Sequence, residues 1–244
     1  MALPRACIPG KAGCRRSPNN TASFALTSLA SASPGRRPTV ITASIAIRAL
    51  SPPRSIRSSS NVVLGGNSLG GQIAWATALT FPERVERLIL VDSAGYAFRS
   101  ESVPIAFRIA RLPGINRLME NILPRSMVEA SVKNVYGNPD AVTPALVDRY
   151  YDLARREGNR HALAQRFEQN KPGQMAERIP TLRLPVLILW GARDRLIPLK
   201  NGQQFNQDIA GSQLQVFEDL GHVPQEEDPQ RTVQAVAKFI AVTR

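Results

Sequence analysis

The sequence predicts an α/β protein with a mostly parallel β-sheet that is covered by helices on both faces. Three observations support this fold class. Short runs of Val, Ile and Leu are almost continuously apolar, which is typical of buried parallel strands. Stretches that favour helix separate these runs. The chain of 244 residues is long enough to form one sizeable α/β domain.

The predicted elements follow one another from residue 61 onward. An apolar run predicts a first strand from Asn61 to Leu64. A helix from Ser68 to Thr80 follows it and ends before Pro82. The segment from Arg84 to Asp92 contains a second buried strand, Val85 to Val91.

Residues 95–180 lack comparable apolar runs and favour helices. The expected helices are 103–111, 124–135, 143–156 and 159–170. Segments rich in Pro, Gly and Asn separate them. We interpret this region as a helical insertion between two strands of one sheet. The sheet domain would then consist of residues 61–94 and 181–244.

The sheet resumes after the insertion. Strands are expected at 186–190 and 214–217, with a helix at 198–209 between them. A closing amphipathic helix is expected at 229–242. Its predicted apolar face consists of Val233, Val236, Ala237, Phe239 and Ile240.

Charge and composition argue against several classes of protein. The formal net charge is +12, but residues 1–60 hold nine Lys and Arg and no acid, which leaves +3 on the remainder. The sequence has no basic patch with interleaved aromatic residues, so we expect no nucleic-acid partner. The apolar runs are too short to cross a bilayer, so we expect no membrane partner. We expect a cytoplasmic protein that acts on a small molecule.

Few residues are available for metal, redox or acid–base chemistry. The two cysteines, Cys7 and Cys14, match no metal, redox or disulfide pattern. We therefore expect no metal and no cofactor. Any mechanism that needs a histidine must use His161 or His222. His161 lies in the helical insertion and is interpreted as facing solvent.

A glycine-rich corner joins the first strand to the first helix. It reads Gly66-Asn67-Ser68-Leu69-Gly70, a G-x-S-x-G pattern in the strand–turn–helix context of a nucleophile elbow. Such a turn leaves no room for Cβ atoms at the flanking positions, so glycine is needed there. The serine would stand at the positive end of the following helix. A Gly-Ser loop without chemistry is the alternative interpretation.

Two further residues complete a candidate catalytic triad. Ser68, Asp194 and His222 each follow a predicted strand, so they fall at the edge where open α/β sheets place their sites. His222 would accept the proton of the serine hydroxyl, and Asp194 would bind the other ring nitrogen. The backbone N–H of Leu69 would stabilise the oxyanion.

Other interpretations remain open for the acid and the base. Asp194 could be a surface turn residue paired with Arg193 or Arg195, and His222 could be a loop histidine. Asp92 also ends a predicted strand and is a lower-ranked position for the acid.

Taken together, these segments resemble the α/β-hydrolase superfamily. Gly66 to Gly71 resembles its elbow, Trp190 to Asp194 its acid loop and Gly221 to Glu226 its histidine loop. The resemblance implies the α/β-hydrolase fold, with residues 95–180 as a helical cap over the substrate pocket. It also implies a serine hydrolase, since epoxide hydrolases and haloalkane dehalogenases carry aspartate at the position of Ser68.

The Gly-Asn-Ser form of the elbow narrows the resemblance. It is similar to the elbow of carbon–carbon bond hydrolases of aromatic degradation and of related esterases. The function implied is hydrolysis of an ester-like or activated C–C bond in a small apolar substrate by a Ser-His-Asp triad. The alternative is a catalytically impaired or non-catalytic remnant of such an enzyme.

The alternative of an impaired or non-catalytic remnant arises from residues 1–60. They are rich in Ala, Ser, Arg and Pro and show no periodicity. They could be a disordered tail or a transit peptide. However, the codons of Leu26 to Thr42, read from their third base, are compatible with D-L-P-G-F-G-L-S-G-P-S-P-D-G-D-Y. That string resembles the segment that precedes the elbow in the superfamily. Our hypothesis is a frameshifted segment, which would remove the loop that supplies the second oxyanion donor. The coding DNA tests it.

Overall fold

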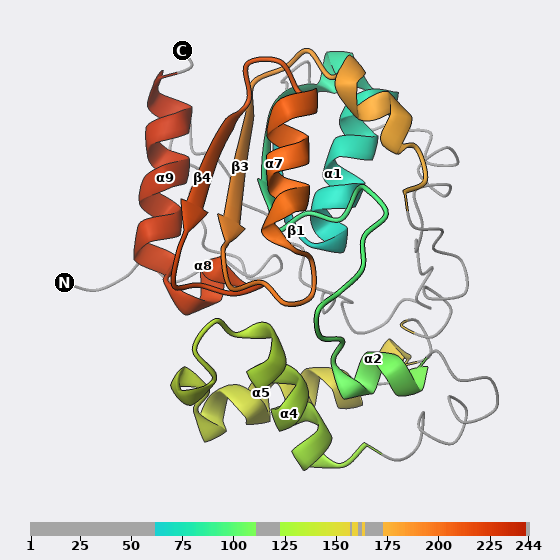
Figure 1. Cartoon of the computed structure of the whole chain (residues 1–244), viewed down its shortest axis with the longest axis vertical. Coiled ribbons are helices and arrows are strands. Elements are labelled where there is room, and N and C mark those ends of the chain that lie inside the picture. The colour runs from blue at the N-terminus through green and yellow to red at the C-terminus, as the bar shows by residue number, and fades with distance from the viewer. Residues whose placement is uncertain (1–61, 111–122, 157, 161–162, 164–172, 243–244) are drawn as a thin grey trace, which may run out of the picture.

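The computed structural model describes residues 62–110, 123–156, 158–160, 163 and 173–242. Within them, four parallel strands form one sheet in the order β1-β2-β3-β4. The strands are β1 (Val62–Asn67), β2 (Val85–Val91), β3 (Val186–Gly191) and β4 (Gln213–Phe217). Figure 1 shows that they run side by side and end at the same edge.

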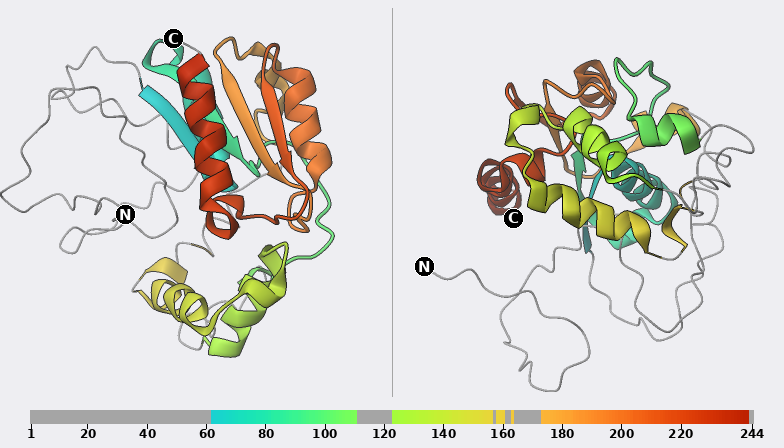
Figure 2. Two further views of the ribbon diagram at one scale, coloured as in Figure 1. Left: turned by 90° about the vertical axis from the view of Figure 1, so that its left-hand side faces the viewer. Right: turned by 90° about the horizontal axis from the view of Figure 1, so that it is seen from below.

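Helices connect the strands and close the sheet domain. They are α1 (Leu69–Thr80), α7 (Leu199–Asp208), α8 (Pro224–Glu227) and α9 (Pro229–Val242), with the 3-10 turns η2 (Pro82–Arg84) and η4 (Ala176–Thr181). Helices α1 and α7 lie on one face of the sheet, and α9 lies on the other (Figure 1, Figure 2). The predicted α/β fold with helices on both faces is confirmed.

Alternating side chains of the central strands face the two helical layers. Leu88 and Leu90 of β2 pack in one cluster with Trp75 of α1 and Phe205 of α7. Ile89, between them in the sequence, packs in a second cluster with residues of α9. Because successive strand residues point to opposite faces, a strand buried on both sides needs an unbroken apolar run. Trp75 and Trp190 are fully buried in the first cluster.

Between β2 and β3 the chain forms helices beyond the carboxyl ends of the strands (Figure 2). They are α2 (Ile105–Ala110), α4 (Arg125–Val135) and α5 (Pro144–Arg155), with the turn η3 (Pro139–Ala141). Thr143 begins α5 by accepting a hydrogen bond from Leu146 N at 3.2 Å. Val128 and Val132 of α4 form a small core with Val223, which lies next to His222 in the sequence. This core attaches the helices to the loop after β4.

The elements that the sequence predicts agree with the structure to within a few residues, with two corrections. The first strand is longer and less buried than predicted: it continues to Asn67, and Val62 is 44% exposed. Pairing with β2 continues as far as Asn67 opposite Val91, which accounts for the extra length. Within the described residues β1 is an edge strand, so its side chains are less covered.

The buried face of α9 also differs from the prediction. Val233 is 65% exposed and Ala237 is exposed, whereas Thr232, Ala235 and Phe239 are buried. Thr232 tolerates burial because its hydroxyl donates to the carbonyl of Asp228 at 3.0 Å.

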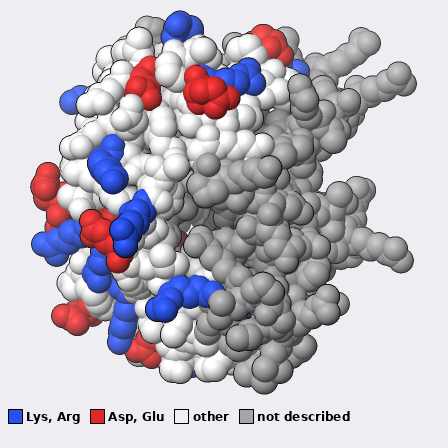
Figure 3. All heavy atoms as spheres, turned by 45° about the vertical axis from the view of Figure 1, so that its right-hand side comes forward, with Lys and Arg blue, Asp and Glu red and all other residues white. Residues whose placement is uncertain are grey.

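Several predictions fall outside the described residues. They concern residues 1–60 and most of the predicted helix at 159–170, including His161. In the described part of the chain, no helix combines the length and apolar character that a membrane span requires. On the face shown in Figure 3, described acidic and basic side chains are intermixed.

Candidate active site

Polar residues follow all four strands at the edge that faces α4 and α5. Ser68 follows β1, Asp92 follows β2, Asp194 lies in the loop after β3 and His222 lies in the loop after β4. The strands are parallel and adjacent, so their carboxyl ends meet at one edge of the sheet. In the structure Ser68, Asp194 and His222 each follow a strand, and their roles remain a prediction.

Ser68 occupies a strained turn between β1 and α1. Its φ is 55° and its ψ is −115°, a conformation that only Gly adopts readily. Ser68 N donates to Val91 O at 2.9 Å, and Ser68 O accepts from Ala94 N at 2.9 Å, which fixes the turn against the end of β2. A Cβ on Gly66 would collide with the backbone of Gly70. This close approach is the reason for glycine at that position.

Asp194 is buried and turned inward. Its side chain accepts hydrogen bonds at Oδ1 from Leu196 N at 2.8 Å and Ile197 N at 2.9 Å. The residue is 3% exposed, so the alternative of a surface turn residue paired with Arg193 or Arg195 is wrong. Two backbone donors stabilise the ionised carboxylate in this buried position.

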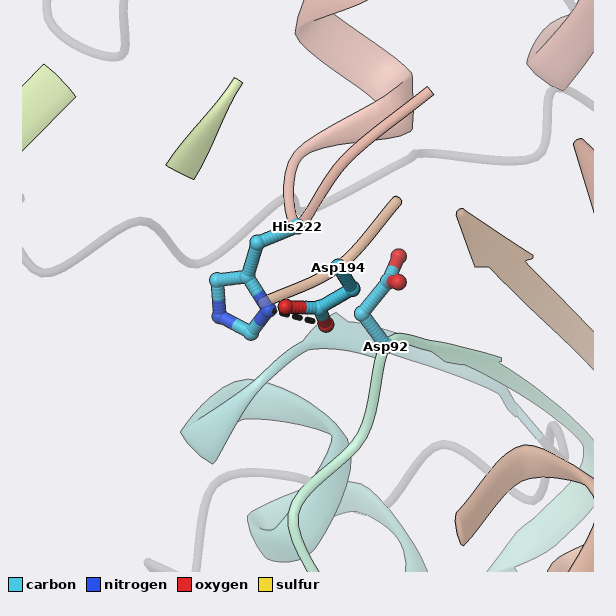
Figure 4. A group of neighbouring side chains, drawn as sticks. All are labelled: Asp92, Asp194 and His222. Carbon is cyan, nitrogen blue, oxygen red and sulfur yellow. Dashed lines mark hydrogen bonds and ion pairs between the residues drawn. The ribbon is translucent and has the colours of Figure 1, made fainter. Parts of the chain in front are cut away.

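His222 forms a hydrogen-bonded pair with Asp194. Its Nδ1 lies 2.7 Å from Asp194 Oδ2, with both side chains buried (Figure 4). The backbone of His222 is held from two directions: its N–H donates to Val135 O at 2.8 Å, and its carbonyl accepts from Asn67 Nδ2, also at 2.8 Å. The bond to Asp194 fixes the ring so that Nε2 is the nitrogen available for chemistry.

Ser68 and His222 are not joined directly in this structure. Among the described residues, no hydrogen bond connects Ser68 Oγ to His222. The connection runs through Asn67, whose amide donates to Val91 O at 3.2 Å as well as to His222 O. Catalytic hydrogen bonds are often long before substrate binds, so this arrangement is compatible with a triad.

Leu69 is placed as an oxyanion donor requires. It is the first residue of α1, and its N–H has no acceptor among the described residues. Free N–H groups and the positive end of the dipole both occur at a helix N-terminus. Ser68 N, by contrast, is already bonded to Val91 O.

Asp92 belongs to the same cluster, although the sequence ranks it low. It is fully buried, has φ of 42°, and accepts at Oδ1 from Gly191 N at 3.0 Å. Its Oδ2 has no hydrogen-bond partner among the described residues. Burial, together with the charge of Asp194, raises the pKa of Asp92 well above its ordinary value. A polar residue directly after an apolar strand is the only sequence feature that points to it.

The cluster could in principle be considered a metal site. One ligand atom each of Asp92, Asp194 and His222 lies within 4.8 Å of the others. However, His222 Nδ1 and Asp194 Oδ2 already share a hydrogen bond in the structure. The pair is therefore arranged for proton chemistry.

Glu226 and Glu227, which follow His222, hold its loop in place. The sequence alone assigned neither of them a separate role. Glu227 accepts from Gly137 N at 2.7 Å and from Gly221 N at 2.8 Å. Glu226 accepts from Arg149 Nη2 at 2.6 Å. Partial burial raises the pKa of Glu227 despite these donors. The acidic pair that follows His222 is the sequence feature by which this connection to α4 and α5 can be found.

A cavity of about 600 Å³ lies beside this connection. Tyr136, Leu146, Arg149 and Glu226 are among the residues that line it. Neither Ser68 nor His222 contributes to its lining. The residues that line the cavity are therefore different from the candidate triad.

Comparison with known proteins agrees with this architecture. The family model described as alpha/beta hydrolase fold matches residues 56–229. The uncharacterized hydrolase YugF of Bacillus subtilis is 28% identical over 179 residues, which cover 73% of this chain and 64% of that protein. An Escherichia coli 2-hydroxy-6-oxononadienedioate/2-hydroxy-6-oxononatrienedioate hydrolase is 31% identical, with coverage of 72% and 61%. The chain thus spans about three fifths of the length of these relatives.

Solved structures show the same fold. A meta-cleavage product hydrolase from Pseudomonas fluorescens has a TM-score of 0.62 at 25% identity, covering 76% of this chain and 66% of that one. A thermophilic esterase from Thermogutta terrifontis has a TM-score of 0.60 at 24% identity, with coverage of 74% and 65%. The second likeness concerns the fold alone.

Proposed function

The chain belongs to the α/β-hydrolase fold family, and from that premise we propose that it is a serine hydrolase acting on an ester-like or activated C–C bond in a small, mainly apolar substrate. The observation that carries the proposal is the buried contact of 2.7 Å between His222 Nδ1 and Asp194 Oδ2, at the same sheet edge as a serine with positive φ. A histidine oriented by a carboxylate near a strained serine is the arrangement that nucleophilic catalysis needs.

The proposed reaction begins at Ser68. A serine hydroxyl is a weak nucleophile at neutral pH, so His222 Nε2 takes its proton as Oγ attacks the substrate carbonyl. The proton then passes from His222 to the leaving group. A water molecule, activated in the same way, releases the acyl group and restores the serine.

In this proposal, Asp194 orients and stabilises His222. The carboxylate accepts the Nδ1 proton, fixes the tautomer and stabilises the imidazolium that forms during proton transfer. Its two backbone donors, Leu196 N and Ile197 N, hold it in one orientation.

Leu69 N is the proposed oxyanion donor. Negative charge develops on the substrate oxygen during attack, and a donor already in position stabilises it without reorganisation. The free N–H at the start of α1 supports this role.

The substrate class rests on the relatives and on the helices above the site. Of the proteins that this chain resembles, one is a meta-cleavage product hydrolase, one is a 2-hydroxy-6-oxononadienedioate/2-hydroxy-6-oxononatrienedioate hydrolase and a third is an esterase. Helices α2, α4 and α5 lie beyond the strand ends, where we propose that they form a cap over the substrate. We propose the same two bond types, ester and activated C–C, for this chain.

One observation favours the second candidate, an impaired or non-catalytic hydrolase. Among the described residues, Ser68 Oγ and His222 are not hydrogen-bonded, and Leu69 N is the only group to which we assign the role of oxyanion donor. Loss of one oxyanion donor typically reduces the rate by about 10²–10³-fold.

A fluorophosphonate probe, which modifies activated serines, separates the two candidates. We expect the 244-residue chain to be labelled and Ser68→Ala to be unlabelled. Ser212→Ala is the matched control, because the Ser212 hydroxyl bonds to Asn206 in a turn far in sequence from Ser68, and it should be labelled like the parent. Absence of labelling in a chain shown to be folded by circular dichroism would exclude the enzyme proposal for this chain. Aryl esters and a vinylogous 1,5-diketone, tested in parallel, then distinguish the two bond types.

A further inference from the structure

Asp92 presents an unusual combination of complete burial and incomplete bonding. Its carboxyl group is fully enclosed, yet it accepts one hydrogen bond, from Gly191 N to Oδ1. Oδ2 has no partner in the described part of the chain. A buried carboxylate oxygen without a donor is strongly destabilising, whereas a protonated oxygen becomes a donor itself.

A second carboxyl group lies beside it. One oxygen of Asp92 and one of Asp194 lie within 4.8 Å, and Figure 4 shows the two side chains next to each other. Two buried carboxyl groups this close oppose each other's ionisation, which favours a state in which one of them holds a proton. Asp194 has three donors, Leu196 N, Ile197 N and His222 Nδ1, whereas Asp92 has one. The negative charge therefore belongs on Asp194 and the proton on Asp92.

We propose that Asp92 is a neutral carboxylic acid that positions Asp194 by directing the proton on its Oδ2 toward the Asp194 carboxylate. This inference rests on the proposed function, because Asp194 matters to the chemistry only if His222 is the base. Asp92 would link the ends of two strands: Oδ1 holds Gly191 of β3, and the Oδ2 proton holds the loop that follows. Positive φ at Asp92 orients the side chain inward for both tasks.

The charged groups around Asp92 determine the pH above which it can no longer hold its proton. Asp194 and Glu227 are the acidic groups that raise its pKa, after burial itself, and His222 is the neighbouring base of the cluster. When pH rises far enough to ionise Asp92, a second negative charge appears beside Asp194. The donor to Asp194 is lost at the same moment. We therefore expect activity to fall on the alkaline side, and we expect this fall to depend on Asp92.

The first test measures the proton directly and needs no substrate. Infrared difference spectroscopy of the full chain should show a protonated carboxylic acid band at pH 7 that is absent in Asp92→Asn. Absence of such a band, or a band that persists in Asp92→Asn, would overturn the inference. Because this readout is independent of turnover, it remains decisive even if the chain fails to react with the fluorophosphonate probe.

The second test uses variants and probe labelling rates. Asparagine keeps the shape of a neutral acid and a donor at the same place, so Asp92→Asn should label within about threefold of the parent at pH 7. Asp92→Leu removes the donor and should slow labelling by about 10–100-fold. The alkaline decline should be present in the parent and absent in Asp92→Asn.

The matched comparison is Asp194→Asn, in which a required carboxylate is neutralised. If Asp92→Asn, folded by circular dichroism, loses as much labelling as Asp194→Asn, then Asp92 is needed as an anion and the inference is wrong. If the probe labels none of the proteins, the proposed function fails for this chain, and the infrared measurement alone decides the protonation of Asp92.

Discussion

The structure supports the turn at Ser68 and the pair formed by Asp194 and His222 in different ways. Strand β3, before Asp194, is buried along its whole length and has a neighbour on each side. Strand β1, before Ser68, is half-buried and pairs with β2 alone in the described sheet. Asp194 and His222 are held by several hydrogen bonds, whereas Ser68 is held by a strained turn that needs close glycine packing. The candidate site thus combines an Asp194–His222 pair that several hydrogen bonds hold with a Ser68 turn that depends on one close backbone contact.

The largest effect should come from a substitution of Asp194, because it should remove the proposed chemistry without disturbing the fold. Asp194→Asn should leave the fold intact at neutral pH and lower the fluorophosphonate labelling rate by about 10⁴-fold, since the amide favours the wrong histidine tautomer. Stopped labelling assays measure the rate, and circular dichroism measures the fold. A loss of less than tenfold would show that another acid serves His222.

The second largest effect should come from the turn around Ser68, where one added methyl group should disturb both the fold and the activity. A Cβ at Gly66 would meet backbone that cannot move aside, so Gly66→Ala should destabilise the chain by about 2–4 kcal/mol and abolish labelling. Gly65→Ala is the matched control, because its Cβ would lie 3.5 Å from Ile89 Cβ, an ordinary contact. Urea denaturation midpoints compare the two. Equal midpoints would mean that the elbow is less constrained than its geometry indicates.

The connection between the histidine loop and α4 should give an intermediate effect. Glu227→Gln keeps one acceptor where the carboxylate serves both Gly137 N and Gly221 N, so we expect a loss of about 1–2 kcal/mol in stability, reduced by partial exposure. Labelling should slow modestly because His222 is less well positioned. Glu218→Gln, on the exposed residue after β4, controls for loss of charge. Identical behaviour of the two variants would contradict a positioning role for Glu227.

The last prediction concerns the pH dependence of stability that Asp92 contributes. Its pKa is raised in the folded state from an ordinary value near 3.8, so the folded chain binds the proton more tightly than the unfolded chain. This contribution is fully present below the ordinary value and is lost as pH rises toward the raised pKa. Asp92→Asn has no such dependence, so its stability relative to the parent should increase with pH. Parallel thermal melts across this window measure the difference. A constant difference would indicate that the pKa of Asp92 is not raised.

Much of the sheet could be predicted from the sequence because apolar runs fix its buried strands. Val85 to Val91 and Val186 to Trp190 are apolar on both faces, and the structure buries both. The position of Ser68 follows from the glycines around it, and the placement of Asp194 and His222 follows from the strands before them. These patterns are local, so they can be recognised in the sequence without knowledge of tertiary contacts.

The features that were missed depend on contacts between distant segments. Burial of Thr232 becomes favourable only when its hydroxyl finds a carbonyl, which hydrophobic periodicity does not register. Helix α8 has four residues, too few to show a helical period. The role of Asp92 requires Asp194, which lies 102 positions later, to be brought beside it. Such long-range pairs have no signature in a single sequence.

The bond from Asn67 Nδ2 to His222 O also bears on the timing of assembly. The two residues are 155 positions apart, so the bond closes a very long loop. Contacts of this kind form late in folding, since the entropy of a long loop must be overcome before they can contribute. During synthesis the first strands emerge long before the histidine loop is available. We therefore expect the turn at Ser68 to form before His222 is in place, so the proposed triad would be completed late in folding.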